Sequence, residues 1–414
     1  MAGASVKIEA PDSADISLRG PLSLERAIEI ALENHPSLKE AKSNVDSQSA
    51  RLGQSAAAAR PRVSASSSYG YSYSEAGGER GSMNTEFTLQ QTIFDWNRTE
   101  LSIKEARQQL EALLLDENGT EEDVARSVMD AYFSLNRSER AVKIAAERLE
   151  NYSKRLKWAE DFYHLGAKAK IEVTRAQTDL ATAKLDMVSS QGARQKALSN
   201  LAYAMGVAMS TPEILEDGLE FVPYDINLSE AIDTAMNNRD DLKAQSVRIE
   251  AARTSLALAK KGMSPTLSGS AGYSFTGEID PFDERGWRVS VGLSIPVTDG
   301  GETRERVKQA EANLEGVMAR WESMAQNVIL QARTSHASLV EARESVEAAY
   351  EAERQAYETL NLALGRYQAG VGESLEISDA VDGYARSRLS VLTALYNHKS
   401  AEVELKRIMG VITQ

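Results

Sequence analysis

Four stretches of the chain alternate between apolar and small polar residues. In the first of them, valine, alanine and three tyrosines take most of the alternate positions, and serines and a glycine lie between them. An alternation with a period of two predicts β-strands with one apolar face. Polar segments that contain glycine separate the members of each pair, which predicts two hairpins. The predicted strands cover residues 62–74, 83–95, 266–277 and 286–298.

Most of the remaining chain repeats its apolar residues every three or four positions, which predicts α-helices. Residues 98–164 and 302–368 contain no proline. Each stretch can therefore form one helix of roughly 65 residues, about 100 Å long. Apolar spacing that averages about 3.5 residues along 128–163 predicts a left-handed coiled-coil seam. The predicted helical ranges are 23–60, 98–164, 170–206, 228–262, 302–368 and 374–410, and a short amphipathic helix opens the first and the fourth.

The whole pattern occurs twice. A shift of 204 residues aligns Leu24 with Leu228 and Val207 with Val411 without a gap. Solenoid repeats have periods of about 20–50 residues, so this period indicates a duplicated domain with pseudo-twofold symmetry instead. The predicted organisation is an extended N-terminal segment at 1–21, a first repeat at 22–207, a linker at 208–226 and a second repeat at 227–411.

Composition narrows the class of protein. Aromatic residues make up 6% of the chain and there are nine prolines, which is typical of long helices. A formal net charge of −14 argues against nucleic-acid binding, since phosphates need clustered cations. The chain contains no run of about 18 apolar residues, so no transmembrane helix is predicted. The first residues lack the basic and apolar regions of a signal peptide, which is expected of a cytosolic protein or of a mature chain.

An enzymatic function is not predicted. The chain has four histidines and no cysteine, and the histidines show no metal-binding spacing. Glycine motifs for nucleotides are absent as well. We therefore expect no cofactor and no metal site.

The strands decide between a membrane protein and a soluble one. A soluble sheet needs an apolar layer to cover it, yet the helices are already committed to their own seams. A membrane strand needs about 9–11 residues with apolar and polar positions alternating, and aromatic residues near the interfaces. The predicted interface aromatics are Tyr69, Tyr71, Tyr73 and Trp287 near one end, and Phe94 and Trp96 near the other.

Four strands cannot close a barrel, and open sheet edges are not tolerated in lipid. The chain is therefore expected to oligomerise. Three copies supply about twelve strands, an even number that leaves a lumen. Two or four copies remain open on this argument. The alternative is a soluble coiled-coil scaffold, which explains the helical seams but not four strands at matched places.

With these features in place, the chain resembles the TolC-type outer-membrane efflux and secretion channels (outer-membrane factors). The resemblance covers nearly all of the sequence, because the same motifs follow in the same order twice. They are the segment 27–38, Pro61 and Pro265 before the strands, Asp95-Trp96 and Asp299-Gly300-Gly301 after them, and the turns 163–166 and 367–370.

The resemblance implies a mainly α fold with a membrane β-barrel. Three chains form a homotrimer with a twelve-stranded barrel in the outer membrane of a Gram-negative bacterium and an antiparallel coiled-coil α-barrel tunnel in the periplasm. The linker and the termini form an equatorial belt. The implied function is the passive exit duct of a tripartite efflux or type I secretion system, with a periplasmic adaptor and an inner-membrane transporter as partners.

The resemblance also implies a gate at the periplasmic tip. Its acidic residues fall on Glu172, Glu376 and Asp379, and its tyrosine falls on Tyr367. Gly372 occupies the position of an arginine that locks the gate in relatives, for which Lys168 or Lys170 is a candidate substitute. A simpler interpretation is that acids in the first turn of a helix only favour its dipole.

Two glycines at the helical turns complete the predicted sites. The resemblance places Gly166 and Gly370 against the adaptor. Both also suit a left-handed turn at the end of a helix, and the two roles are compatible.

Overall fold

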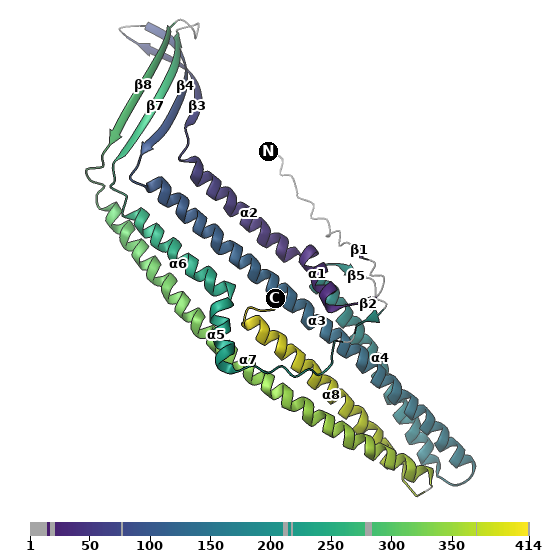
Figure 1. Ribbon diagram of the computed structural model, residues 1–414. Helices are drawn as coiled ribbons and strands as arrows, with labels where there is room; N and C mark the ends of the chain where they lie inside the picture. The colour runs from purple at the N-terminus through teal and green to yellow at the C-terminus, as the bar shows by residue number, and fades with distance from the viewer. Residues whose placement is uncertain are drawn as a thin grey trace. The chain divides into compact units, whose positions relative to one another are not determined.

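The computed structural model describes residues 15–16, 21–75, 78–209, 214–216, 218–277, 284–369 and 371–412 (Figure 1). The described part of the chain is mainly helical. Its helices are α1 Leu24–Asn34, α2 Pro36–Ala57, α3 Arg98–His164, α4 Lys170–Met205, α5 Leu228–Asn238, α6 Asp240–Ala259, α7 Glu302–Gln368 and α8 Ser374–Ile408. Its longer strands are β3 Arg62–Ser74, β4 Gly78–Phe94, β7 Thr266–Gly277 and β8 Glu284–Ser294, and its two-residue strands are β1 Asp15–Ile16, β2 Pro21–Leu22, β5 Ala208–Met209 and β6 Ile214–Leu215.

Two strands differ in length from the prediction. β4 begins at Gly78 rather than at residue 83, because Gly78 already pairs with Ser74 at the end of β3. β8 ends at Ser294 rather than at residue 298. Its partner strand begins at Thr266, opposite Ser294, and Pro296 has no N–H to extend the ladder.

The chain divides into two compact units, and each draws on both sequence repeats. We call them the helical unit (residues up to 40, 118–239 and from 326 on) and the sheet unit (41–117 and 240–325). The repeats are therefore not the compact bodies. Each repeat instead contributes equivalent elements to both units.

The sheet unit contains four antiparallel strands in the order β3–β4–β7–β8 (Figure 1). Their register aligns residues of one kind in rows across the sheet. One row consists of Val63, Leu89, Ala271 and Val289, and a neighbouring row on the other face consists of Ser64, Thr88, Gly272 and Arg288. The alternation in the sequence thus becomes one apolar face and one polar face.

The turn from strand to helix is built alike in both halves of the sheet unit. The Asp95 carboxylate accepts a hydrogen bond from the Thr99 N–H, and Asp299 accepts one from the Thr303 N–H, each at 2.8 Å. The two residues after each aspartate have positive φ angles: Trp96 and Asn97 at 58° and 69°, Gly300 and Gly301 at 66° and 93°. Glycine adopts this conformation without strain, whereas the first repeat adopts it with two larger residues.

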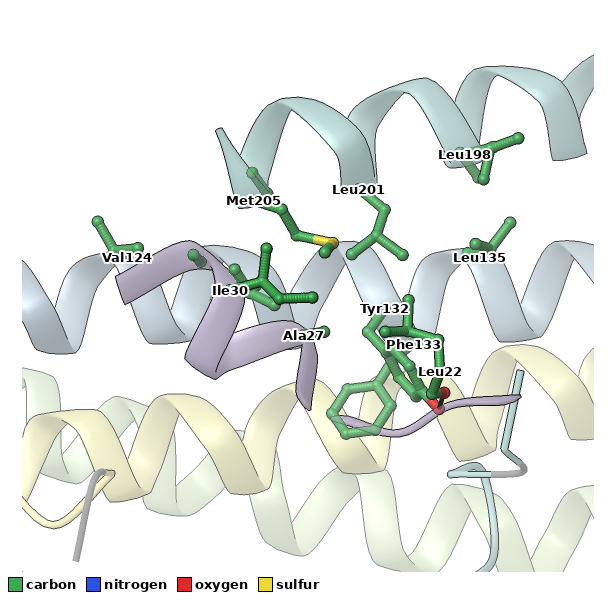
Figure 2. Close-up of a cluster of buried hydrophobic side chains, with 14 of the residues drawn as sticks. Leu22, Ala27, Ile30, Val124, Tyr132, Phe133, Leu135, Leu198, Leu201 and Met205 are labelled. Atoms are coloured by element: carbon green, nitrogen blue, oxygen red, sulfur yellow. Dashed lines mark hydrogen bonds between the residues drawn. The ribbon is translucent and has the colours of Figure 1, made fainter. Parts of the chain in front are cut away.

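The helical unit has an apolar core around α1, α3 and α4 (Figure 2). Ala27 and Ile30 of α1 pack with Leu135 of α3 and with Leu201 and Met205 of α4, all of them buried. Ser23 begins α1 as its N-cap, because its hydroxyl accepts a hydrogen bond from the Arg26 N–H. The amphipathic pattern of this short helix therefore determines which of its faces covers α3 and α4.

A polar contact in the helical unit fixes the chain just before α1. The Tyr132 hydroxyl of α3 lies 2.9 Å from the Leu22 carbonyl oxygen and 2.8 Å from that of Glu216. In the second repeat, position 336 corresponds to 132 and position 226 corresponds to 22. There, Nε2 of His336 lies 3.0 Å from the Ile226 carbonyl oxygen. The duplication has kept this contact while replacing a tyrosine with a histidine.

The end of α4 lies close to the turn between α1 and α2. Gly206 has a φ of 68°, and a Cβ added there would lie 2.8 Å from the His35 Cα.

We expect Gly206→Ala to lower the free energy of unfolding by about 1–3 kcal/mol, since it combines backbone strain with a clash against backbone. The melting temperature of the detergent-solubilised protein measures this effect.

A matched control lies on the same helix. Gly192 is inside α4 with open space around its Cα, so Gly192→Ala should stabilise the helix by about 0.5–1 kcal/mol. Equal melting temperatures for the two variants would contradict the close approach at Gly206.

Candidate channel wall and helical tip

The polar face of the sheet is a candidate channel lining. Serine, threonine and glycine occupy most of its positions, and they are small and uncharged. Charged residues on this face include Glu86 on β4 and Arg288 on β8, and also Arg62 and Glu284, which begin β3 and β8. Gly272 lies between the strands of Glu86 and Arg288, and a Cβ added there would lie 3.1 Å from a Glu86 carboxylate oxygen. The carboxylate therefore lies over the glycine. Such a surface suits contact with water.

The apolar face of the sheet is uncovered. Val289 and Val291 are each 66% exposed, and Leu293 is 61% exposed. In an isolated soluble sheet such a face has an apolar layer packed against it, and no described residue of the sheet unit provides one. This arrangement contradicts a sheet whose apolar side is buried within its own unit.

The predicted interface aromatics all have exposed rings. The register places Tyr69, Tyr71, Tyr73 and Trp287 on the apolar face, with Trp287 opposite Tyr273. Phe94 ends β4, and its ring lies edge-on to that of Trp96 with centroids 5.0 Å apart. These positions are compatible with an interfacial role, which stays a prediction.

The predicted gate tyrosine, Tyr367, is 2% exposed and packs against Trp158 and Phe162 of α3. Burial raises its pKa, the Glu172 carboxylate raises it further and Arg155 opposes the shift. The hydroxyl is therefore protonated at neutral pH. Glu172 itself has one carboxylate oxygen that is buried without a hydrogen-bond partner in the described part of the chain.

The other two predicted gate residues lie apart from this aromatic contact. Glu376 forms an ion pair with Arg366 at 3.0 Å, between α8 and α7. Asp379 is exposed. The structure thus brings Tyr367 and Glu172 together, and it leaves the carboxylates of Glu376 and Asp379 accessible on α8.

Gly372 cannot hold a side chain in this backbone. A Cβ added there would lie 2.8 Å from the Tyr367 backbone nitrogen. The suggested substitution of a lysine for the missing arginine is not observed either, because neither Lys168 nor Lys170 forms an ion pair among the described residues. Arg366 is the cation that reaches the acidic end of α8.

The turn between α3 and α4 contains Gly166, whose φ is 73°. Its N–H donates to the Tyr163 carbonyl oxygen at 3.0 Å, as in a left-handed turn that ends a helix. A Cβ at this glycine would meet nothing within 4 Å, so the position is open. Gly370, the other predicted adaptor residue, lies outside the described residues.

The sequence pattern did not predict a buried polar site of the helical unit, which we call the tip cluster. It joins α3 to both α4 and α8. Its members are Arg148, Tyr152 and Arg155 of α3, Asp179 and Asp186 of α4, and Ser374, Ser378 and Asp382 of α8.

Arg155 is the centre of the tip cluster and is 2% exposed. One terminal nitrogen contacts both the Asp179 carboxylate and the Ser378 hydroxyl, and the other lies 2.5 Å from the Ser374 hydroxyl. A buried guanidinium is tolerated only with such partners, since an unpaired buried charge is costly. Arg155 therefore holds the first turns of α8 against α3 and α4.

A second part of the tip cluster lies further along the same helices. The Tyr152 hydroxyl donates to Asp382 at 2.5 Å, and Arg148 donates to the same carboxylate oxygen at 2.8 and 3.0 Å. Burial raises the pKa of Tyr152, and the hydrogen bond to Asp382 raises it further, so this donor keeps its proton. In the sequence, the one available signal for the tip cluster was an arginine next to the apolar seam of the segment that forms α3.

None of the helices in the described part of the chain is both long and apolar enough to cross a lipid bilayer. The described residues also contain no group of three side chains arranged to hold a metal ion.

Comparison with known proteins agrees with this architecture. The profile of the family described as outer membrane efflux protein matches residues 27–207 and 231–411. The chain is 27% identical over 377 residues to protein CyaE of Bordetella pertussis, covering 89% of this chain and 79% of that protein. It is 22% identical over 409 residues to outer membrane protein OprJ of Pseudomonas aeruginosa, covering 94% and 84%.

A solved structure has the same fold. The structure of CusC, described in terms of transmembrane channel formation, superposes with a TM-score of 0.83 at 18% identity and covers 97% of this chain and 99% of the other. A two-faced sheet joined to long helices, in two repeats, is thus the fold of an outer-membrane channel subunit. The chain belongs to the outer membrane efflux protein family, which confirms the predicted function as an outer-membrane channel and the predicted location.

The tip cluster makes a direct prediction about local stability. Arg155→Met keeps the length of the side chain but removes the guanidinium donors to Asp179 and Ser374. Among the described residues of the cluster, Asp179 then keeps only the Ser378 hydroxyl as a donor. We expect a cost of about 1–3 kcal/mol, because buried acceptors lose their partners while Asp179 stays partly hydrated. Hydrogen exchange of backbone amides 374–382 should accelerate by about tenfold or more.

Arg175→Met is the matched control. Arg175 pairs with Glu172 at 3.7 Å and its side chain is more than half exposed, so its loss should change stability by less than about 1 kcal/mol. If both variants exchange at the rate of the parent protein, Arg155 does not hold α8 in place.

Proposed function

We propose that this chain is one of three subunits of the exit duct of a tripartite efflux or type I secretion system. The single observation that supports this most strongly is the four-stranded sheet, which has an exposed apolar face, a polar face and two unpaired edges. β3 and β8 each pair on one side only. Their outer edges carry N–H and C=O groups that water cannot satisfy inside a bilayer.

Copies of the same chain satisfy these edges most simply. β8 of one subunit pairs with β3 of the next, and the sheet closes when the last subunit meets the first. Three subunits supply about twelve strands, which is within the range of membrane barrels that enclose a lumen. Closure turns the row that contains Ser64 and Arg288 toward the lumen and the row that contains Val63 and Val289 toward lipid.

The duct performs no chemistry in this proposal. Its barrel lining consists mainly of hydroxyl and glycine positions, which present no strong site for any one solute. Transport is therefore passive, and the driving force comes from an inner-membrane transporter through a periplasmic adaptor. Gly166, which is open and lies at a helical turn, is the proposed adaptor contact, together with Gly370.

The gate is proposed at the helical tip. Arg155 and Tyr152 hold α8 against α3 and α4, and Tyr367 with Glu172 packs at the end of α7. In a trimer, Glu376 and Asp379 of three chains approach one another around the axis. Six carboxylates at a constriction attract cations and repel each other, so the polar contacts behind them have to keep the tip closed.

Assembly tests the proposed function. Val291→Arg places a charge on the apolar face of β8, which costs about 2–4 kcal/mol at the middle of a bilayer. We expect the yield of detergent-extracted trimer to fall severely, as measured by native electrophoresis of outer-membrane extracts.

Ser290→Arg is the matched control, since it adds the same charge one residue away on the polar face. It should assemble like the parent protein. Normal trimer yield from Val291→Arg, or a parent protein that stays monodisperse in plain buffer without detergent, would support the soluble scaffold instead.

Conductance tests the gate. Replacing Glu376 and Asp379 with alanine removes the exposed carboxylates at the start of α8, so cation selectivity should fall or the closed-state current should change in planar bilayers. Glu351→Ala removes an exposed carboxylate of α7 away from its end and should leave both unchanged. Identical currents for all three proteins would remove the gate assignment without affecting the barrel.

A further inference from the structure

The two repeats differ at an ion pair that the duplication should have preserved. In the first repeat, Arg194 of α4 donates to the Glu139 carboxylate of α3 at 2.9 and 3.1 Å. With the offset of 204 residues, the equivalent positions in the second repeat are Arg343 of α7 and His398 of α8. A salt bridge has thus become a pair of basic residues. His398 is the buried member of this pair, whereas the Arg343 side chain is 34% exposed.

His398 is buried. It is 1% exposed, and its Nε2 has no hydrogen-bond partner among the described residues. Its ring packs edge-on against Phe221, with centroids 5.0 Å apart. Phe221 belongs to residues 218–227, which we call the linker segment, and it packs against Val346 and Ala394 of α7 and α8.

The charges around His398 come from two helices and the linker segment. Arg343 of α7 forms an ion pair at 3.7 Å with Asp225 of the linker segment. On α8, Lys399 and Glu402 flank the histidine and pair with each other at 3.2 Å. A proton on His398 would therefore meet the cations Arg343 and Lys399, each of which already pairs with a carboxylate, without gaining a hydrogen bond on Nε2.

Burial lowers the pKa of His398, Lys399 and Arg343 lower it further, and Glu402 opposes them. A histidine released to water returns to an ordinary pKa of about 6.5. The packed state thus has its full stability above that value. As the pH falls through it, the released state takes up a proton that the packed state resists, so acid favours release.

We infer that His398 is an acid-sensitive latch, whose protonation releases Phe221 and the linker segment from α7 and α8. The ring loses its edge-on contact with Phe221, because a charged imidazole near Arg343 requires water. This latch does not depend on the proposed exit duct, and it can be tested on the detergent-solubilised protein alone.

The other histidine at the linker segment has a different role. His336 lies 3.0 Å from the Ile226 carbonyl oxygen, a contact in which Nε2 donates its hydrogen. Both the neutral Nε2–H tautomer and the protonated ring can donate there. Acid therefore leaves the Ile226 end of the linker segment attached while the Phe221 end opens.

A single cysteine can report this opening, because the chain has no cysteine of its own. Ala394 is buried in the cluster against which Phe221 packs, whereas Ser390 is exposed on the same helix. Ala394→Cys and Ser390→Cys are each reacted with a pyridyl disulfide. Dividing the first rate by the second cancels the intrinsic effect of pH on the thiol. We expect the ratio to rise between about pH 7.5 and about pH 5, by no more than about tenfold per pH unit for one proton.

Substitutions at the latch separate protonation from general loosening. His398→Gln should react slowly at all pH values, and His398→Arg should react quickly at all of them. Adding Arg343→Glu to His398→Arg rebuilds the ion pair of the first repeat, so slow and pH-independent reaction should return. His336→Gln should keep the acid response of the parent protein.

The outcomes that would overturn the latch are specific. One is a rate ratio of the parent protein that does not change with pH, and another is an acid response that persists in His398→Gln. Loss of helical circular dichroism over the same pH range would attribute the reaction to unfolding and would also reject the proposal. Trimer yield and bilayer currents do not enter this test, so its failure and that of the proposed function are distinguishable.

Discussion

Backbone hydrogen bonding at the edges of the sheet is the constraint on which the rest of this protein depends. Inside a bilayer each unpaired N–H or C=O costs several kcal/mol, so a strand needs partners on both sides. β3 and β8 have one partner each within the chain. The same segments place apolar residues on one face and hydroxyl groups on the other. An outer-membrane channel accounts for both features together, because closure of the sheet pairs the edges and separates lipid from water.

The duplication gave the chain two copies of each local contact, and the copies have since diverged where the local chemistry allows it. The aspartate that starts the long helix is the same in both, and it bonds an N–H four residues later in each. The two residues after it take the same left-handed conformation with different side chains. Tyr132 and His336 hold equivalent carbonyl oxygens. Positions 194 and 398 have diverged further than these, since an ion pair in one repeat corresponds to a buried histidine in the other.

The helical unit is held by apolar packing in one place and by buried polar groups in another. Around α1 the side chains are aliphatic or alanine, and burial alone stabilises them. In the tip cluster, Arg155 and Tyr152 are just as buried, but every contact there needs a matched donor and acceptor. Apolar contacts tolerate small shifts, whereas charged contacts lose much of their energy when a partner moves. Contacts of the second kind therefore suit the gate that we propose at the tip.

The sequence by itself was sufficient for the strands and the long helices, because periods of two and of about 3.5 are local properties of the chain. It was sufficient for the duplication because the two halves align without a gap, and for the class of protein through the resemblance of its motifs to a known family. It was not sufficient for the division into units that draw on both repeats, for the closeness of Gly372 to Tyr367, or for the tip cluster. Arg155 meets Ser374 only because α3 and α8 pack with particular rotations about their axes. Those rotations follow from the packing of whole helices, and no pattern within a single helix encodes them.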